Sequence, residues 1–313
     1  MISFAKPPKL KAGARLAIVS PASTPKPERV QAGADALRAL GCEPVVFPHA
    51  LTRGPLYYAG TAEQRADDLQ SAFRDTSIDG VICTRGGWGS AELLPLLEKK
   101  IFRDNPKPFI GYSDHSSLHT WLQQECGLVT FHGPMVAADL SRENGEDAAS
   151  WASAFGGDAS WELSAGSGLR VLQKGRVKGT LRGGCLSILA ESLGTPYAFR
   201  AESGTILFLE DIGHKAYQWD RQLLHLRYAG VLDGVSGILF GDMAQCAQTP
   251  EEAERIEHAI LHVLKDLRGP IGIGLRSGHV HGGNITLPFG VNVELDLSNG
   301  NPALHFQEAA VRD

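Results

Sequence analysis

The stretch Asp79-Gly-Val-Ile-Cys-Thr-Arg-Gly-Gly-Trp-Gly-Ser90 runs from a short apolar segment through a glycine-rich turn into a segment of helical character. The same alternation recurs along the first half of the chain, where Thr61-Ala-Glu-Gln64 has the form of a capping box that starts a helix. The apolar segments are residues 14–20, 43–47, 79–84, 108–112 and 128–131. Short strands that alternate with helices predict βαβ units and a parallel sheet. We therefore expect an α/β domain with ligands bound beyond the carboxyl ends of its strands.

A change in composition divides the chain. Residues 139–168 are rich in Ser, Ala, Gly and acidic side chains and lack a clear strand, which predicts a linker. The second half then returns to short strands and helices. We expect an N-terminal α/β domain over residues 1–138, a linker region over 139–176, and a C-terminal domain over 177–313.

Composition and charge exclude several classes of protein. The 313 residues carry 30 Lys and Arg against 35 Asp and Glu and contain no basic run, so no nucleic-acid partner is expected. No apolar stretch approaches the length of a membrane span, and residues 1–11 do not have the pattern of a signal peptide. The five cysteines are widely spaced, which predicts neither disulfides nor a zinc site. We expect a cytoplasmic protein.

The segment Phe109-Ile-Gly-Tyr-Ser-Asp-His115 places a serine at the turn between an apolar strand and a helix. Such a turn exposes the Ser113 hydroxyl and leaves the N–H of Asp114 to donate to an oxyanion. His115 stands where the nucleophile elbow of hydrolases has its second glycine. The alternative is that Ser113 only caps the following helix, and the segment by itself favours the cap.

The loop Arg85-Gly-Gly-Trp-Gly89 also follows a strand and precedes a helix. Glycine-rich loops of this kind present backbone N–H groups to an anion. One interpretation is a phosphate loop, although the spacing matches neither of the common phosphate-binding motifs. Another is the second half of an oxyanion hole, with Gly87 as the donor. A plain turn between strand and helix is the third.

Two later strand ends carry an acid and a histidine. Phe208-Leu-Glu-Asp-Ile212 holds two carboxylates, and Arg276-Ser-Gly-His279 ends on a histidine. Taken alone, such residues are more often solvated turn residues than catalytic groups. Together, Ser113, Glu210 and His279 supply the nucleophile, acid and base that acyl transfer needs. Neighbours on a strand face opposite sides, so only one of the two carboxylates can point to the histidine.

Two histidine pairs have spacings that occur in metal sites, His279-x-His281 and His115-x-x-x-His119. The second pair lacks the glutamate of a zinc-peptidase helix, and a catalytic metal would need a convergent set of further ligands. We expect no metal and no cofactor.

Five motifs in this order and spacing resemble the LD-carboxypeptidase family of serine peptidases, which also contains the microcin-immunity peptidases. The resemblance covers about residues 11–297. The motifs are Arg85-Gly-Gly-Trp-Gly89, Gly111-Tyr-Ser-Asp114, Gly179-Thr-Leu-Arg-Gly-Gly184 with Leu193-Gly-Thr-Pro196, Phe208-Leu-Glu-Asp211, and Gly278-His279 with Asn284-Ile-Thr-Leu-Pro288.

The resemblance implies a catalytic triad of Ser113, Glu210 and His279, with oxyanion donors at the backbone of Gly87 and Asp114. It implies an N-terminal doubly wound, flavodoxin-like parallel-sheet domain and a C-terminal β-rich α/β domain. Members of the family release the terminal D-Ala of murein tetrapeptides by cleaving an L,D-bond, in cytoplasmic recycling of cell-wall peptides. Dimers are common among them, so we expect a homodimer.

Two alternative functions stay open. One is the microcin-immunity activity, hydrolysis of peptidyl- or aminoacyl-nucleotide amides, for which Trp88, Trp151 or Trp161 would serve as a stacking platform. The other is a non-catalytic nucleotide- or sugar-binding module that uses the 85–89 loop. The sequence departs from the family pattern at Cys185, where we expect Asn, and at Trp88, where Tyr is more usual.

Overall fold

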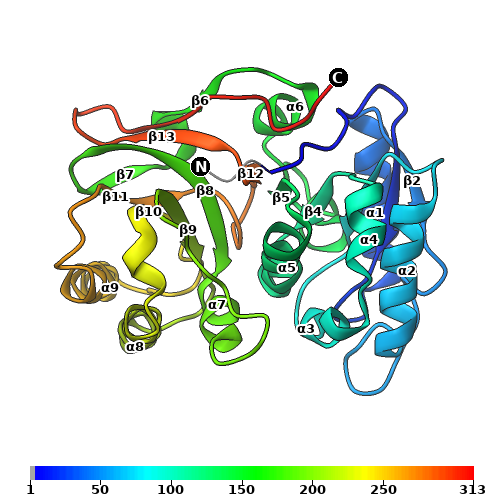
Figure 1. Ribbon diagram of the computed structural model, residues 1–313, viewed down its shortest axis with the longest axis horizontal. Helices are drawn as coiled ribbons and strands as arrows, with labels where there is room; N and C mark the ends of the chain where they lie inside the picture. The colour runs from blue at the N-terminus through cyan, green and yellow to red at the C-terminus, as the bar shows by residue number, and fades with distance from the viewer. Residues whose placement is uncertain (1–3) are drawn as a thin grey trace. The chain divides into compact units, whose positions relative to one another are not determined.

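The computed structural model describes residues 4–313, which form two compact α/β units, each with its own sheet (Figure 1). The N-terminal unit comprises the described residues up to Asp158, together with Gly282–Gly290 and Ala309–Asp313. The C-terminal unit comprises Ala159–His281 and Val291–Glu308. Two α/β domains, the first with a mostly parallel sheet and the second with a mixed sheet, confirm the predicted fold class.

The N-terminal sheet has six strands in the order β12-β5-β4-β3-β1-β2. The strands are β1 (Arg15–Val19), β2 (Glu43–Val46), β3 (Gly80–Cys83), β4 (Phe109–Gly111), β5 (Thr130–His132) and β12 (Leu287–Phe289). Strands β1 to β5 are parallel, and β12 joins the edge antiparallel to β5. The chain leaves β1 to one side for β2 and to the other side for β3. This reversal is the switch point at which doubly wound sheets bind ligands.

Helices cover this sheet in two groups. Its helices are α1 (Pro27–Ala39), α2 (Ala62–Arg74), α3 (Ser90–Leu93), α4 (Lys99–Asp104), α5 (Ser116–Cys126) and α6 (Ala148–Gly156). Helix α1 packs against the π-helical turn η3 (Val136–Leu140), whereas α4 lies between α2 and α5. Thr61 and Gln64 exchange hydrogen bonds at the start of α2, so the predicted capping box is confirmed.

The C-terminal sheet has eight strands in the order β6-β14-β13-β8-β9-β10-β11-β7. They are β6 (Trp161–Leu163), β7 (Arg170–Gln173), β8 (Arg176–Cys185), β9 (Thr205–Glu210), β10 (Val235–Gly241), β11 (Ile271–Leu275), β13 (Asn292–Asp296) and β14 (Ala303–Phe306). The four central strands β8 to β11 are parallel, and the outer strands are antiparallel. Helices α7 (Leu186–Ser192), α8 (Ala216–Tyr228) and α9 (Pro250–Val263) pack on one face through a buried core that includes Trp219 and Phe240 (Figure 1).

The stretch expected to be a linker contains regular structure. Helix α6 and strands β6 and β7 all lie within residues 139–176, so the expectation that 139–168 lacks a strand is wrong. Strand β6 is only three residues long, and it is positioned by contacts with β14, which lies far away in the sequence. Trp161 stacks on Phe306 of β14, with ring centroids 3.9 Å apart. The division at residues 138 and 177 stays a prediction.

Two further expectations can be compared with the described part of the chain. The five cysteines all lie within the described residues, are buried, and form no disulfide there. Within residues 4–313, the structure has no helix long and apolar enough to cross a membrane.

Gly33 marks the contact between α1 and η3. A Cβ atom built at this position would overlap the carbonyl oxygen of Val136, which belongs to backbone and cannot swing away. The helix and the turn therefore approach each other so closely that only glycine fits.

We expect Gly33→Ala to destabilise the protein by about 1–3 kcal/mol, because α1 must move away from η3. In an open helix the same substitution stabilises by roughly 0.5–1 kcal/mol. Gly156→Ala, at the end of α6, is the matched control, since nothing lies within 4 Å of its Cβ position. Urea unfolding followed by circular dichroism measures both variants. A Gly33→Ala protein as stable as the Gly156→Ala protein would contradict the close contact.

Candidate active site

Ser113 follows β4 and opens the short helical turn η2 (Ser113–His115), from which α5 continues. Its φ is +64°, in the left-handed region that residues other than glycine rarely adopt. Such a backbone costs on the order of 1–3 kcal/mol and persists only where the surroundings enforce it. No side chain caps η2 or α5, and the capping positions are Tyr112 and His115. The interpretation of Ser113 as a simple helix cap is therefore wrong, and its strained turn has the form of a nucleophile elbow.

The 85–89 loop packs directly against this turn. A Cβ atom at Gly86 would lie 2.8 Å from both Cβ and Oγ of Ser113, so the residue at position 86 has to be glycine. Asp114 is fully buried, and its carboxylate accepts a hydrogen bond of 2.8 Å from the N–H of Ser90, just past the loop. Burial raises the pKa of this carboxyl group. The structure thus brings together the two segments that sequence analysis singled out in the N-terminal half.

His115 joins the same two segments from below the surface. Its Nε2 donates to the carbonyl of Arg85 at 3.0 Å, because a carbonyl can only accept. Nδ1 therefore accepts from the Ser90 hydroxyl at 2.9 Å. Burial lowers the pKa of His115 to about 4, so the ring is neutral at pH 7. His115 is a buried clamp between loop and turn, and sequence analysis did not anticipate that function.

The histidine pair at helical spacing is engaged with backbone. His119 donates through Nε2 to the carbonyl of Gly111 at 2.7 Å, and burial lowers its pKa to about 3. In the part of the chain that the structure describes, no group of three or more His, Cys, Asp or Glu side chains has the arrangement of a metal site.

Gly87 occupies the exposed tip of the loop with φ +108°. A Cβ atom there would overlap the hydroxyl of Ser23, whose Oγ also accepts a hydrogen bond from the N–H of Trp88 at 3.3 Å. Ser23 follows β1 and therefore supports the loop from the neighbouring strand end. Sequence analysis missed it, although its place after an apolar strand was the available signal.

Glu210 ends β9 and is completely buried. Its Oε2 accepts hydrogen bonds from Nδ1 of His279 at 2.7 Å and from the backbone N–H of His279 at 3.0 Å. A carboxylate that accepts from Nδ1–H leaves Nε2 of the ring unprotonated, which is the tautomer of a general base. The side chain of His279 is 17% exposed, so the ring reaches the surface of the C-terminal unit.

The backbone before His279 makes room for this pair. Gly278 has φ +96°, and a Cβ atom there would lie 2.5 Å from Oε2 of Glu210. The segment that carries His279 therefore packs directly against the carboxylate of Glu210. This packing and the two hydrogen bonds from His279 fix the acid and the ring relative to each other.

Asp211 faces the other side of the strand end. It accepts a hydrogen bond from the N–H of Ser187 at 2.8 Å, and its second oxygen lies 2.9 Å from Nδ1 of His214. Burial alone would raise the pKa of Asp211, but the His214 ring and the N–H donors lower it overall. The structure therefore pairs Glu210, and not Asp211, with His279, which sequence pattern alone left undecided.

Cys185 ends β8 directly beside Glu210 in the register of the parallel pair. Burial, first of all, and the neighbouring carboxylates raise the pKa of its thiol well above the ordinary value, so the thiol stays protonated. A neutral thiol thus stands beside the acid, at the position where family resemblance led us to expect an amide.

The tryptophans differ in what they can offer to a ligand. Trp151 is buried against Phe155, and one face of Trp161 is covered by Phe306. Trp88 is half-buried in the loop that packs on Ser113. Of the three candidate stacking platforms, Trp88 is the one that belongs to the loop in contact with Ser113.

The candidate site therefore has two halves, each defined within its own unit. The N-terminal unit contributes Ser113, Asp114 and Gly87, and the C-terminal unit contributes Glu210 paired with His279. The first half has the form of a nucleophile with backbone donors, and the second half has the form of an oriented base.

Comparison with known proteins gives consistent matches over both units. Residues 16–133 match the family model described as LD-carboxypeptidase N-terminal domain, and residues 178–295 match the LD-carboxypeptidase C-terminal domain. A putative carboxypeptidase of Streptomyces coelicolor is 40% identical over 97% of this chain and 97% of its own length. A probable murein peptide carboxypeptidase of Bacillus subtilis is 33% identical over 94% of this chain and 92% of its own.

Among solved structures, an MccF-like protein from Bacillus anthracis has a TM-score of 0.89 at 25% identity. The match covers 96% of this chain and 99% of that one.

The pH dependence of the free energy of unfolding tests whether His115 is buried in its neutral form between the 85–89 loop and the Ser113 turn. The pKa of His115 is about 4 in the folded protein and close to 6.5 when unfolded, so the unfolded chain binds more protons between these values. The stability contributed by the neutral ring is complete above pH 6.5 and is lost as the pH falls towards 4, by about 3 kcal/mol in total.

We expect His115→Gln to lose less stability over this interval than the wild-type protein. Urea unfolding at pH 7, 6, 5 and 4 measures the difference, and subtraction of the two profiles removes the contribution of other groups such as Asp114. Parallel profiles for the two proteins would contradict the neutral, buried state of His115.

Proposed function

Because the chain belongs to the LD-carboxypeptidase family of serine peptidases, we propose that it releases the terminal D-Ala of murein tetrapeptide by cleaving the L,D-bond. The observation that carries this proposal is the left-handed backbone of Ser113 against the glycine loop. Strained backbone is concentrated at functional sites, and a strained serine at a strand-to-helix turn is the form that a nucleophile elbow takes. The oriented His279 supports the same conclusion.

In the proposed mechanism the two halves of the site act on one substrate. Nε2 of His279 takes the proton of the Ser113 hydroxyl, and Oγ attacks the scissile carbonyl. Glu210 keeps the ring oriented and stabilises its charged form. The N–H groups of Gly87 and Asp114 hold the oxyanion.

The tetrahedral intermediate then breaks down to an acyl-enzyme, and hydrolysis of the acyl-enzyme completes the reaction. The C–N bond breaks as His279 returns its proton to the leaving D-Ala amine, which leaves an ester on Ser113. Water, deprotonated by the same ring, attacks this ester. The ester C–O bond then breaks as His279 returns the proton to Oγ of Ser113, which releases the shortened peptide and restores the serine. No cofactor takes part in the proposed cycle, and we propose cytoplasmic peptide recycling by a homodimer as its setting.

A second candidate is hydrolysis of an aminoacyl- or peptidyl-nucleotide amide. It is supported by the similarity to the MccF-like protein and by the half-buried Trp88 in the loop that contacts Ser113, since an aromatic face can stack on a base. The chemistry of Ser113 and His279 would be the same for both substrates, so only the leaving group distinguishes them. A non-catalytic nucleotide- or sugar-binding module remains as the third hypothesis.

We expect Ser113→Ala to lower kcat on purified murein tetrapeptide by about 10⁴-fold, as in other serine triads. Mass spectrometry of released D-Ala measures this, with an aminoacyl-adenylate analogue assayed in parallel for the second candidate. A fluorophosphonate probe provides the matched test of the third hypothesis, because it labels an activated serine. Undiminished turnover by the Ser113→Ala protein would remove Ser113 from the mechanism.

The adjacent carboxylates Glu210 and Asp211 provide an internal control. Glu210→Gln should reduce kcat by about 10³- to 10⁴-fold, because the amide no longer fixes the base tautomer of His279. Asp211→Asn should leave kcat within a few-fold, because Asp211 contacts Ser187 and His214 instead. Steady-state kinetics on both variants, with circular dichroism to verify folding, decide between them. The reverse order of effects would contradict the assignment.

A further inference from the structure

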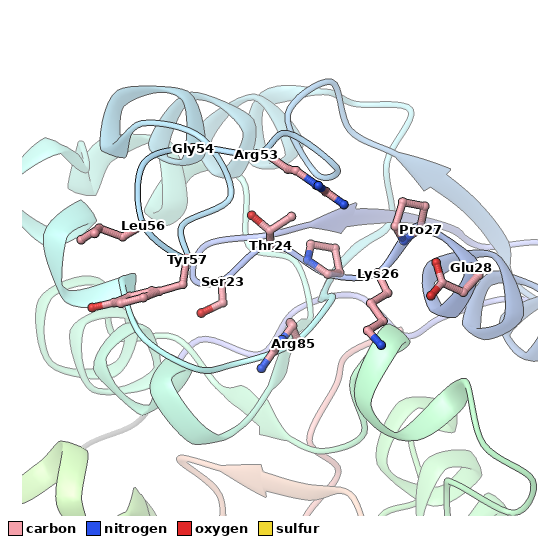
Figure 2. A pocket seen from close by; sticks show the side chains of 11 residues that line it. Ser23, Thr24, Lys26, Pro27, Glu28, Arg53, Gly54, Leu56, Tyr57 and Arg85 are labelled. Atoms are coloured by element: carbon pink, nitrogen blue, oxygen red, sulfur yellow. The ribbon is translucent and has the colours of Figure 1, made fainter.

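A cavity of about 550 Å³ opens in the N-terminal unit where the segment after β1 meets the 53–57 loop and Arg85 (Figure 2). It lies at the carboxyl ends of β1 and β3, which flank the switch point of the sheet. Cavities at this place in doubly wound sheets hold ligands. Ser113, Glu210 and His279 do not line this cavity, whereas Ser23 and Arg85 of the loop region do.

The lining of the cavity is cationic. Lys26, Arg53 and Arg85 contribute three positive charges against the single carboxylate of Glu28. Figure 2 shows the three basic side chains on different sides of Thr24, while Glu28 lies beside Pro27 and away from Arg85. In a protein with a formal net charge of −5, this is a local reversal of sign.

These three charges are not consumed by the fold. Within the described part of the N-terminal unit, the side chains of Lys26, Arg53 and Arg85 have no hydrogen bond or ion pair. Arg65 shows the contrast, because it is buried and donates to the carbonyls of Pro21 and Gly89 and to Glu92. Arg65 is thus a structural cation, whereas the three at the cavity are available to an anion.

The N-terminal end of α1 adds to the positive electrostatic potential of the cavity. Pro27 and Glu28, in the first turn of the helix, line the cavity, so the helix presents its N-terminal end there. The partial positive charge of a helix N-terminus favours an anion. No side chain caps the end of α1, whose N-cap residue is Lys26.

The cavity adjoins the nucleophile turn through a short chain of contacts. Ser23 lines the cavity and lies against Gly87, while Gly86 lies against Ser113. The Cα atoms of two consecutive glycines are about 3.8 Å apart. The loop that contacts Ser113 is therefore the same loop that borders the cavity.

The opposite wall of the cavity is apolar and open. Leu56 is 84% exposed and Tyr57 is 51% exposed, although both are large hydrophobic side chains. Leu56 also has a left-handed backbone, with φ +55°. An anionic group attached to a carbon framework would satisfy both walls, because the charge faces the basic side chains and the framework covers Leu56 and Tyr57.

We propose that this cavity is an anion subsite, which binds a carboxylate or phosphate of the substrate away from the scissile bond. The proposal rests on the proposed function in one respect only, which is that Ser113 acts on the same bound molecule. Free carboxylates of a murein peptide and the phosphate of a nucleotide amide share the required chemistry. Lys26 and Arg53 set the affinity for this group and take no part in bond breaking.

The test compares the double variant Lys26→Gln/Arg53→Gln with Arg29→Gln/Lys11→Gln. The control removes the same charge from the same unit at exposed positions that do not line the cavity. With tetrapeptide as substrate, the cavity variant should raise KM by about 10- to 100-fold, as expected for lost charge-assisted hydrogen bonds. Its kcat should change less than twofold. The control variant should match the wild-type protein in both constants.

Calorimetric binding to Ser113→Ala protein separates this proposal from the proposed function. The three ligands are the tetrapeptide, the same peptide with every carboxylate except that of the terminal D-Ala amidated, and AMP. A carboxylate subsite predicts that amidation and the cavity substitutions weaken binding by the same factor and not cumulatively. A phosphate subsite predicts that the cavity substitutions weaken the binding of AMP and leave the binding of both peptides unchanged.

The outcomes are distinct. Turnover of tetrapeptide by wild-type protein, with affinities for peptide and AMP that the cavity substitutions leave unchanged, overturns the subsite and keeps the proposed function. Absence of turnover, with AMP binding that the cavity substitutions abolish, overturns the proposed function and keeps the subsite.

Discussion

The left-handed backbone of Ser113 is the constraint around which the N-terminal half of the candidate site is built. Gly86 packs against Ser113 and leaves no room for a side chain of its own. The buried carboxylate of Asp114 and the ring of His115 add hydrogen bonds to Ser90 and Arg85. Each of these contacts links the Ser113 turn to the loop after β3. The serine, its backbone donors and the loop are therefore one rigid feature, in which none can move without the others.

The second half of the site obeys a different constraint, because its acid is completely buried. A buried carboxylate is unfavourable unless it is hydrogen-bonded, and Glu210 receives two donors from the single residue His279. The orientation of the ring and the stability of the acid are thus the same interaction. Asp211, one residue later, is satisfied by Ser187 and lies near His214, so the two carboxylates do not compete for one partner.

The sequence predicted what local pattern can specify. The parallel strands of the first half, the capping box at Thr61 and the placement of Ser113 after a strand all follow from short-range periodicity and turn chemistry. Strand β6 was missed, because three residues show no alternation and their pairing with β14 is a long-range event. The choice between two adjacent carboxylates could not be made from strand pattern for the same reason, since a contact with the distant His279 decides it. Ser23 follows an apolar strand, but its contact with the N–H of Trp88 joins two separate strand ends.

Because the edge strand β12 comes from the end of the chain, the N-terminal sheet is completed late during synthesis. Residues 287–289 pair with β5, which lies more than 150 positions earlier in the chain, so the edge of β5 stays unpaired until nearly the whole protein has left the ribosome. Open strand edges are prone to pair with other chains. A fragment ending near residue 158 would retain this exposed edge permanently, and a premature stop codon anywhere before residue 287 would leave the first-made sheet without its edge strand.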